Sequence, residues 1–253
     1  MFETFFYQPV YNVFIFLYNI TPGGNLAITI ILFAILIKGL LYSLTRKQLQ
    51  SQKEMQEIQP KINELKIKYK DSRDELGRAT LALYKEHNIN PFSSCLPVLI
   101  QLPFLYAIFK VLREGLGGNG LNLVYSFIEK PDVIYTNVLP GLDLAQLPFV
   151  IGISPIRFQI ISVIGFLIVI MSAASQYWQM KMMFTQKKVG EISSSNEAED
   201  MAVMMNKQMM YLLPIMMFFI GSTFPIGLSL YWLIITLLSI LQQYFIFKKK
   251  TNP

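Results

Sequence analysis

Residues 26–44 read LAITIILFAILIKGLLYSL, and this stretch decides the fold because Lys38 is its one charged residue. A helix of this length is about 28 Å long, which matches the hydrocarbon core of a lipid bilayer. The whole chain has 253 residues, of which 53% are hydrophobic and only 15% are charged, and its apolar residues come in long blocks. The sequence therefore predicts an all-α integral membrane protein.

Five apolar blocks predict five transmembrane helices, at residues 26–44, 95–112, 158–179, 209–224 and 227–247. Only Pro225 and Ile226 separate the last two blocks, so we expect a tight hairpin there. Residues 1–25 precede the first span, and their apolar run 9–20 is too short to cross a bilayer. We expect that run to form a helix that lies along the outer face of the membrane.

Lysine and arginine are concentrated in three connections. Residues 46–94, 180–208 and 248–253 carry 10, 4 and 3 of the 22 basic residues. Basic connections stay on the cytoplasmic side of a membrane, so residues 180–208 are expected to form a cytoplasmic loop and residues 248–253 a short basic tail. The N-terminus and the connection 113–157 are then outside. The start of the chain does not resemble an organelle transit peptide, which favours a multi-pass protein of a bacterial plasma membrane.

Residues 45–94 form the largest cytoplasmic connection, and their pattern predicts an antiparallel pair of helices. Pro60 suits the first turn of a helix, so we expect a break near Ile58. Ser72 and Glu75 form a capping box that predicts the start of the second helix, which ends near residue 88. Apolar residues spaced three and four positions apart form one packed seam: Met55, Ile58, Ile62, Leu65 and Tyr69.

Lys38 is the charge whose position needs an explanation. A charged side chain at the centre of a bilayer costs about 2.5–3.5 kcal/mol on insertion scales. All 16 aspartate and glutamate residues lie outside the five predicted spans, so no intramembrane carboxylate is expected to pair with it. Two interpretations stay open at this point. Either the lysine snorkels to the cytoplasmic interface, or a water-filled indentation reaches it from the cytoplasm.

Polar side chains on several spans can line such an indentation. In the last span they recur three and four positions apart and so share one helical face. Single Ser, Thr and Gln residues in membrane helices also hydrogen-bond between helices, and for any one of them this alternative is the stronger. Polar faces on several spans beside a buried cation favour a shared hydrophilic groove. The candidate groove residues are Lys38, Tyr42, Gln101, Ser172, Gln176, Ser229, Trp232, Thr236, Ser239 and Gln243.

Several kinds of chemistry lack the residues that they require. The chain has one cysteine, Cys95, one histidine, His87, and no glycine-rich phosphate loop. We therefore expect no disulfide, metal, cofactor or enzymatic activity. A small-solute transporter or channel remains an alternative, and it would predict a repeat or a continuous pore. An intramembrane hydrolase would need a nucleophile beside a base. The net charge of +6 follows the membrane topology and does not indicate DNA binding.

Four segments resemble the YidC family of membrane protein insertases, in the order in which the family has them. They are LYNITPGGNLAITII (residues 17–31), IKGLLYSLTRKQLQSQKEMQEIQPKINELKIKYK (37–70), LYKEHNINPFSSCLPVLIQLPFLYAIFKVL (83–112) and YLLPIMMFFIGSTFPIGLSLYWLIITLLSILQQ (211–243). The resemblance implies five helices around a hydrophilic groove that opens to the cytoplasm. It also implies a functional cation on the first helix. The family has arginine there, and Lys38 keeps the charge but loses the planar fork of donors.

The resemblance further implies a function and a set of partners. Proteins of this family insert and help to fold integral membrane proteins, alone or with the Sec translocon. The implied partners are nascent membrane proteins and membrane lipid. The Sec translocon, the ribosome and targeting factors are candidate partners of the cytoplasmic helix pair. The polar tail of a substrate would pass through the groove, while its apolar helix moves along the second and fourth spans into lipid.

Overall fold

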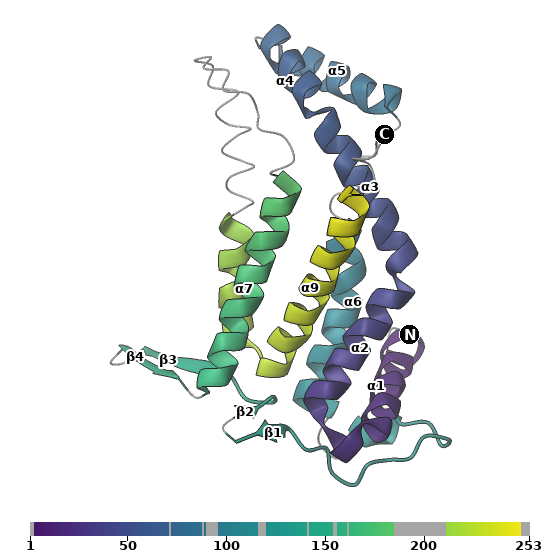
Figure 1. The fold of residues 1–253 in the computed structure, drawn as a ribbon, viewed down its shortest axis with the longest axis vertical. Helices are drawn as coiled ribbons and strands as arrows, with labels where there is room; N and C mark the ends of the chain where they lie inside the picture. Colours follow the sequence, from purple (N-terminus) through teal and green to yellow (C-terminus); the bar gives the residue numbers. More distant parts are fainter. Residues whose placement is uncertain are drawn as a thin grey trace.

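The computed structural model describes residues 3–70, 72–87, 89, 96–115, 120–140, 142–153, 156–160, 162–184 and 211–248. Helices make up most of this part of the chain, as the sequence predicts. Three long helices pack around a fourth, α9 (Ile226–Lys248), and run along the long axis of the molecule (Figure 1): α2 (Leu26–Leu40), α6 (Leu96–Lys110) and α7 (Val163–Phe184). Three more helices extend from one end: α3 (Tyr42–Glu57), α4 (Gln59–Lys68) and α5 (Arg73–Glu86).

Helix α1 (Gln8–Ile20) packs one face against α2 and α6. Tyr11, Phe14 and Ile15 on that face are fully buried. Phe16 and Ile20, on the opposite face, are more than half exposed. A helix that is apolar on both sides suits contact with protein on one side and lipid on the other. Its position along the outer face of the membrane stays a prediction.

The first predicted span is bent. Helices α2 and α3 meet at Leu41 with an angle of 66° between them. The Thr45 hydroxyl lies 3.0 Å from the Leu41 carbonyl and 3.1 Å from the Tyr42 carbonyl. Threonine hydroxyls that bond back to the preceding turn bend helices. The helix expected over residues 26–44 is therefore broken between Leu40 and Tyr42, and its assignment as the first membrane span stays a prediction.

Helices α4 and α5 begin where the sequence predicts. The break falls at Ile58, and Pro60 lies in the first turn of α4. The Ser72 hydroxyl caps α5 by accepting from the main-chain N–H of Glu75 at 3.4 Å. The predicted end of the second helix, near residue 88, falls at the edge of the described residues. A small apolar core joins the two helices and is formed by Ile58, Ile62, Leu83 and Ile89.

Some of the described helices are long enough and apolar enough to cross a membrane. The helices Val163–Met182 and Ile226–Phe247 are long and apolar enough to cross, and the bent pair Leu26–Leu40 with Tyr42–Met55 is a third if it counts as one span. The helix Tyr211–Thr223 is apolar but shorter. The predicted starts of the second and fourth spans, at residues 95 and 209, lie outside the described residues. The count of five spans therefore stays a prediction.

The connection between α6 and α7 contains four short strands, which an all-α fold does not include. Two antiparallel pairs form, β1 (Asn137–Leu139) with β2 (Leu142–Asp143) and β3 (Phe149–Ile153) with β4 (Ile156–Ile160). Strand β4 occupies residue 158, where the third span is predicted to start. That prediction is wrong by five residues, because the helix begins at Val163. The Ser162 hydroxyl accepts from the Gly165 N–H at 3.1 Å, and this cap sets the start of α7.

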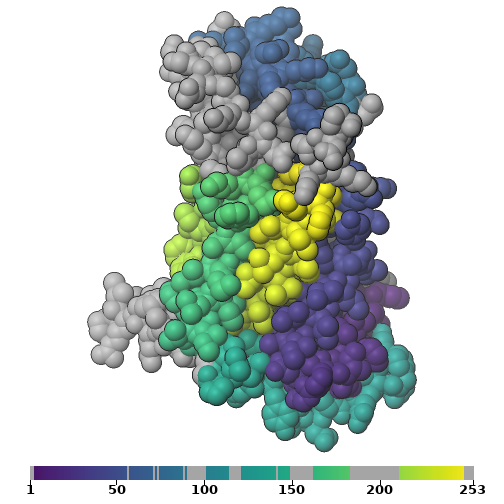
Figure 2. Space-filling model, viewed as in Figure 1, coloured from purple at the N-terminus to yellow at the C-terminus, as the bar shows by residue number. Residues whose placement is uncertain are grey.

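The same connection covers the start of α9. The main-chain N–H groups of Ile226 and Gly227 donate to the carbonyls of Gln146 and Leu144, each at 2.9 Å. The first N–H groups of a helix have no partner within it, so the connection satisfies two of those of α9. Figure 2 shows that the side chains of α7, α9 and α2 adjoin one another on the face in view. The start of α9 is thus held at the end of the molecule where the strands lie.

Candidate functional site

Lys38 lies in the last turn of α2 and reaches across to α9. Its ammonium nitrogen Nζ donates to the Ser239 hydroxyl at 2.8 Å, and this hydroxyl donates in turn to the Ile235 carbonyl at 2.7 Å. Among the described residues, no carboxylate lies within ion-pair distance of Lys38. Elsewhere in the same part of the chain, Glu3 forms an ion pair with Lys110. The hydrogen bond and the charge of Lys110 lower the pKa of the Glu3 carboxyl. Lys38 is half-buried and is held by a neutral hydroxyl.

Helix α6 meets α9 through a second polar contact. Gln101 Nε2 donates to the Tyr231 hydroxyl at 2.5 Å. Tyr231 is 1% exposed, and the centre of its ring lies 6.3 Å from that of Phe33 on α2. Tyr231 is not among the residues that the sequence singles out for the groove. The sequence could have indicated it, because a tyrosine in an apolar helix needs a hydrogen-bond partner for its hydroxyl when it is buried.

A third polar contact joins α3 to α9. The Thr45 hydroxyl lies 3.0 Å from Gln242 Oε1, and Gln242 Nε2 donates to the main-chain carbonyl of Tyr42 at 3.2 Å. Tyr42 therefore contributes its carbonyl to this contact, while its side chain is 49% exposed. Gln242 falls beside the polar stripe of α9, so the spacing of that stripe does not identify it.

Two of the candidate serines take part in hydrogen bonds away from Lys38. The Ser229 hydroxyl donates to the Gly221 carbonyl at 3.2 Å and so joins α9 to the helix Tyr211–Thr223. The Ser172 carbonyl accepts from the Ser175 hydroxyl at 2.8 Å, within α7. Both serines are buried. The alternative of hydrogen bonding between helices therefore fits Ser229, whereas the bond at Ser172 involves only its main-chain carbonyl.

The other candidates lie on α7 and α9. Thr236 is buried, and Trp232 and Gln176 are half-buried. No hydrogen bond links any of these three to Lys38 in the described part of the chain. Gln243 is 0% exposed, and neither of its amide atoms has a partner among the described residues. The structure thus connects Lys38 directly to one predicted groove residue, Ser239.

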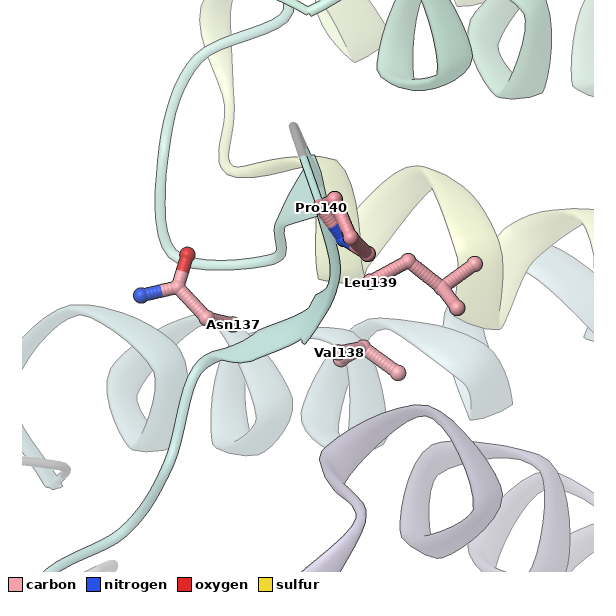
Figure 3. A pocket seen from close by; sticks show the side chains of 4 residues that line it. All are labelled: Asn137, Val138, Leu139 and Pro140. Atoms are coloured by element: carbon pink, nitrogen blue, oxygen red, sulfur yellow. The ribbon is translucent and has the colours of Figure 1, made fainter.

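The described residues contain no group of three His, Cys, Asp or Glu side chains that could hold a metal ion. A hollow of about 330 Å³ lies in the connection with the strands. Its lining residues are Asn137, Val138, Leu139 and Pro140. Figure 3 shows that the Asn137 side chain points in the opposite direction to those of Val138 and Leu139. Strand β1 contacts α2 and lies beside its start (Figure 1), whereas Lys38 lies near its end, so this hollow is separate from the polar contacts of Lys38.

The chain matches known proteins along nearly its whole length. The model of the family described as 60Kd inner membrane protein matches residues 16–252. A Membrane protein insertase YidC from Fusobacterium nucleatum is 36% identical over 248 residues, which cover 97% of this chain and 98% of that protein. Proteins of the same name from Pelobacter propionicus and Rickettsia africae are 33% and 30% identical over 89% and 95% of this chain. The matches cover only 35% and 38% of those two proteins.

Lys38 and the three polar contacts on α9 all lie within the matched residues. The match extends over both ends of the helical bundle, and the Fusobacterium relative aligns over almost its own full length. The chain therefore belongs to the 60Kd inner membrane protein family.

Proposed function

We propose that this chain is a membrane protein insertase, which moves segments of other proteins from the cytoplasmic side into the lipid bilayer. Its family and the name of its relatives support this function. The observation that carries the mechanism is Lys38, a half-buried cation on α2 that is held by the neutral Ser239 hydroxyl. Its work is translocation and assistance in folding, and it breaks no covalent bond.

A lone cation lowers the barrier that a polar substrate segment meets in hydrocarbon. Burying a polar group without a partner costs roughly 2–7 kcal/mol, and an unpaired charge costs more. The Lys38 ammonium and the hydroxyl and amide groups of α9 offer such a segment hydrogen bonds and a compensating charge part-way across. The adjoining apolar helix then partitions into lipid. The membrane potential acts on any charge that the segment carries.

Contacts at the end of the bundle where the strands β1 to β4 lie support a groove that is closed on the outside. The Asn12 amide of α1 donates to the Leu123 carbonyl at 2.9 Å and accepts from the Tyr125 N–H at 2.6 Å. Together with the bonds from Ile226 and Gly227 to the same connection, they hold α1 and α9 together at that end. A small-solute transporter or channel would need a path through it. These contacts favour the insertase over that alternative.

We place five membrane helices in the bilayer, with the N-terminus and the stranded connection outside and the C-terminus in the cytoplasm. Helices α4 and α5 would then receive the nascent chain, the ribosome or targeting factors, and the Sec translocon is a further candidate partner. The substrate's apolar helix would move along α6 and the helix Tyr211–Thr223. The latter supports this role because it exposes a row of large apolar side chains to lipid: Leu212, Ile215 and Phe219.

The proposal is tested by complementation in a bacterium depleted of its own insertase. We expect Lys38→Arg to sustain insertion of a substrate with an acidic outer tail, Lys38→Glu to abolish it, and Lys38→Ala to be intermediate. A substrate with a neutral tail should be less affected, and Lys130→Glu, at an exposed lysine of the stranded connection, is the matched control. Equal insertion with all three Lys38 variants would remove the role of the charge.

A further inference from the structure

Residues 123–135, in the connection between α6 and α7, run alongside α1. Side chains of α1 bond to the main chain of this stretch at 2.6, 2.7, 2.9 and 3.0 Å. The bonded pairs are Asn12 with Tyr125, Asn19 with Glu129, Asn12 with Leu123, and Tyr18 with Tyr135. Because these bonds extend over about two turns of α1, they fix the stretch beside the helix. We call residues 123–135 the strap, and Figure 2 shows the connection (teal) bordering the purple N-terminal helices at one end of the molecule.

The strap presents Phe127 beside the exposed face of α1. This side chain is 81% exposed, and its ring stacks on that of Tyr125 with the ring centres 5.4 Å apart. Phe127 lies between the strap residues that bond to Asn12 and to Asn19. Phe16 lies between the same two asparagines on α1 and is 52% exposed. The strap and the helix therefore present aromatic side chains at the same level.

The exposed face of α1 continues the apolar surface of the bundle. Val13, Phe16 and Ile20 are exposed and are spaced three and four positions apart, so they form one stripe on the helix. The helix packs on α2 and α6, and both of these expose large apolar side chains of their own. These are Ile28, Leu32 and Leu36 of α2, and Leu102 and Tyr106 of α6. Apolar surface of this extent on an integral membrane protein contacts lipid, and α1 with Phe127 beside it extends that surface.

The residues that follow Phe127 mark where this surface meets water. Glu129, Lys130 and Asp132 are charged and exposed. A charged side chain is costly in hydrocarbon, so this part of the strap lies outside the hydrocarbon layer. Aromatic side chains next to charged ones are typical of the interface between membrane and water. A water-soluble partner gives no reason for the apolar stripe to continue onto α2 and α6, whereas a bilayer does.

We infer that α1 and the strap form a lipid-binding surface in the outer leaflet, with Phe127 inserted at the boundary between headgroups and acyl chains. The same connection continues to the carbonyls of Leu144 and Gln146, which bond to the start of α9. Lipid thereby holds in place the connection that covers the closed end of the proposed groove. The inference rests on the proposed function for the placement of this end on the outside.

The test measures how strongly brominated lipid quenches the fluorescence of a tryptophan at position 127. Trp178→Phe and Trp232→Phe remove the two natural tryptophans, and Phe127→Trp then adds one that keeps an aromatic ring. The purified chain is reconstituted in phosphatidylethanolamine and phosphatidylglycerol with a phosphatidylcholine that is brominated near the headgroup end of its acyl chains. Interfacial apolar faces are buried about 5–10 Å into this boundary, so we expect the brominated lipid to lower the emission at least about twofold.

Val133→Trp in the same background is the matched control. Val133 also lies in the strap and is 58% exposed, but it follows the charged residues. Iodide in the aqueous phase should quench this variant, and brominated lipid should not. If brominated lipid quenched Phe127→Trp no more than Val133→Trp, the strap would face water or a protein partner, and the inference would be wrong.

Phe16→Trp separates the strap from the helix. We expect brominated lipid to quench this variant as well, because the stripe of α1 faces lipid. Quenching at position 16 without quenching at position 127 would overturn the inference, since only the helix would then contact lipid. If the background without natural tryptophans does not fold, Phe127→Trp and Val133→Trp in the natural chain carry the test through their difference in quenching from that chain.

The two proposals fail independently. Quenching is measured on purified protein and needs no substrate, so a complementation result in which the charge of Lys38 proves irrelevant leaves the lipid contact standing. Brominated lipid in both leaflets makes the measurement independent of the orientation of the chain. Conversely, a strap that faces water leaves the insertase function and the role of the Lys38 charge untouched.

Discussion

At the scale of single residues, polar groups in this bundle meet in pairs on α9. Gln101 pairs with Tyr231, and both are neutral, so their hydrogen bond leaves nothing uncompensated. Lys38 pairs with Ser239, and here a hydroxyl faces a full charge. Neutral dipoles solvate an ammonium group but do not cancel its charge. Lys38 therefore stays available to a negatively charged group in a way that the other polar residues do not.

The pair of Gln101 and Tyr231 gives a prediction at this scale. Tyr231→Phe removes the hydroxyl and leaves the Gln101 amide without its partner, which should cost about 1 kcal/mol. Adding Gln101→Leu to Tyr231→Phe should recover part of that loss, because neither polar group then remains. A double-mutant cycle on thermal unfolding in detergent measures both effects. Tyr42→Phe, at a 49% exposed ring, should leave Tm unchanged, and a similar loss there would argue against the assignment.

At the scale of elements, close packing of α9 depends on a small residue where other helices approach it. A Cβ atom on Gly227 would lie 3.0 Å from a Leu112 methyl carbon and 3.2 Å from the Ile30 Cδ1. Gly227→Ala should therefore push these neighbours apart and cost about 1–3 kcal/mol. Thermal unfolding in detergent measures the change.

Gly39 supplies the matched control for that substitution. A Cβ atom on Gly39, in the last turn of α2, would have nothing within 4 Å. Gly39→Ala should leave the stability unchanged or raise it by up to about 1 kcal/mol, because alanine favours a helix more than glycine does. If both alanine variants had the same Tm, packing at Gly227 would not limit the approach of the helices.

Elements that rest on local signals are those that the sequence predicts best. Pro60 and the Ser72 cap mark the starts of α4 and α5. The bend at Leu41 depends on a threonine that bonds backwards and on the contact of Gln242 with α3, and the second of these is a tertiary contact. The strands β3 and β4 lie in a stretch whose apolar residues also continue the pattern of a membrane helix. Periodicity alone therefore places the start of α7 too early.

The candidate site was predictable in part, for a related reason. A stripe with helical spacing finds residues on one face, and it includes Ser239, which contacts Lys38. Helix α9 lies in the middle of the bundle and presents polar groups to more than one helix. Tyr231 and Gln242 bond to α6 and α3 from outside that stripe. Ser229 lies on the stripe but bonds to Gly221. Which face meets which helix is a tertiary property that spacing does not contain.

At the scale of the whole molecule, the two ends of the bundle differ in kind. The main apolar core joins α1, α2, α6, α9 and the stranded connection, and on α2 its last fully packed residue is Ile37. Lys38 comes next, followed on α3 by Thr45 and by two buried glutamines, Gln48 and Gln52. Apolar packing at one end and unpaired polar groups towards the other suit a path that opens on one side only. The side on which it opens is then decided by the orientation of the chain.

That orientation gives the last prediction. Val133 in the stranded connection and Leu81 on α5 are 58% and 57% exposed, so cysteines at these positions should react equally well once a reagent reaches them. In a Cys95→Ser background on spheroplasts, a membrane-impermeant maleimide should label Val133→Cys at once. It should label Leu81→Cys only after the membrane is disrupted, because a basic connection such as that around α5 is expected to stay inside. Labelling in the opposite order would place α3, α4 and α5 outside, where no nascent chain arrives, and the proposed insertase path would then run in the wrong direction.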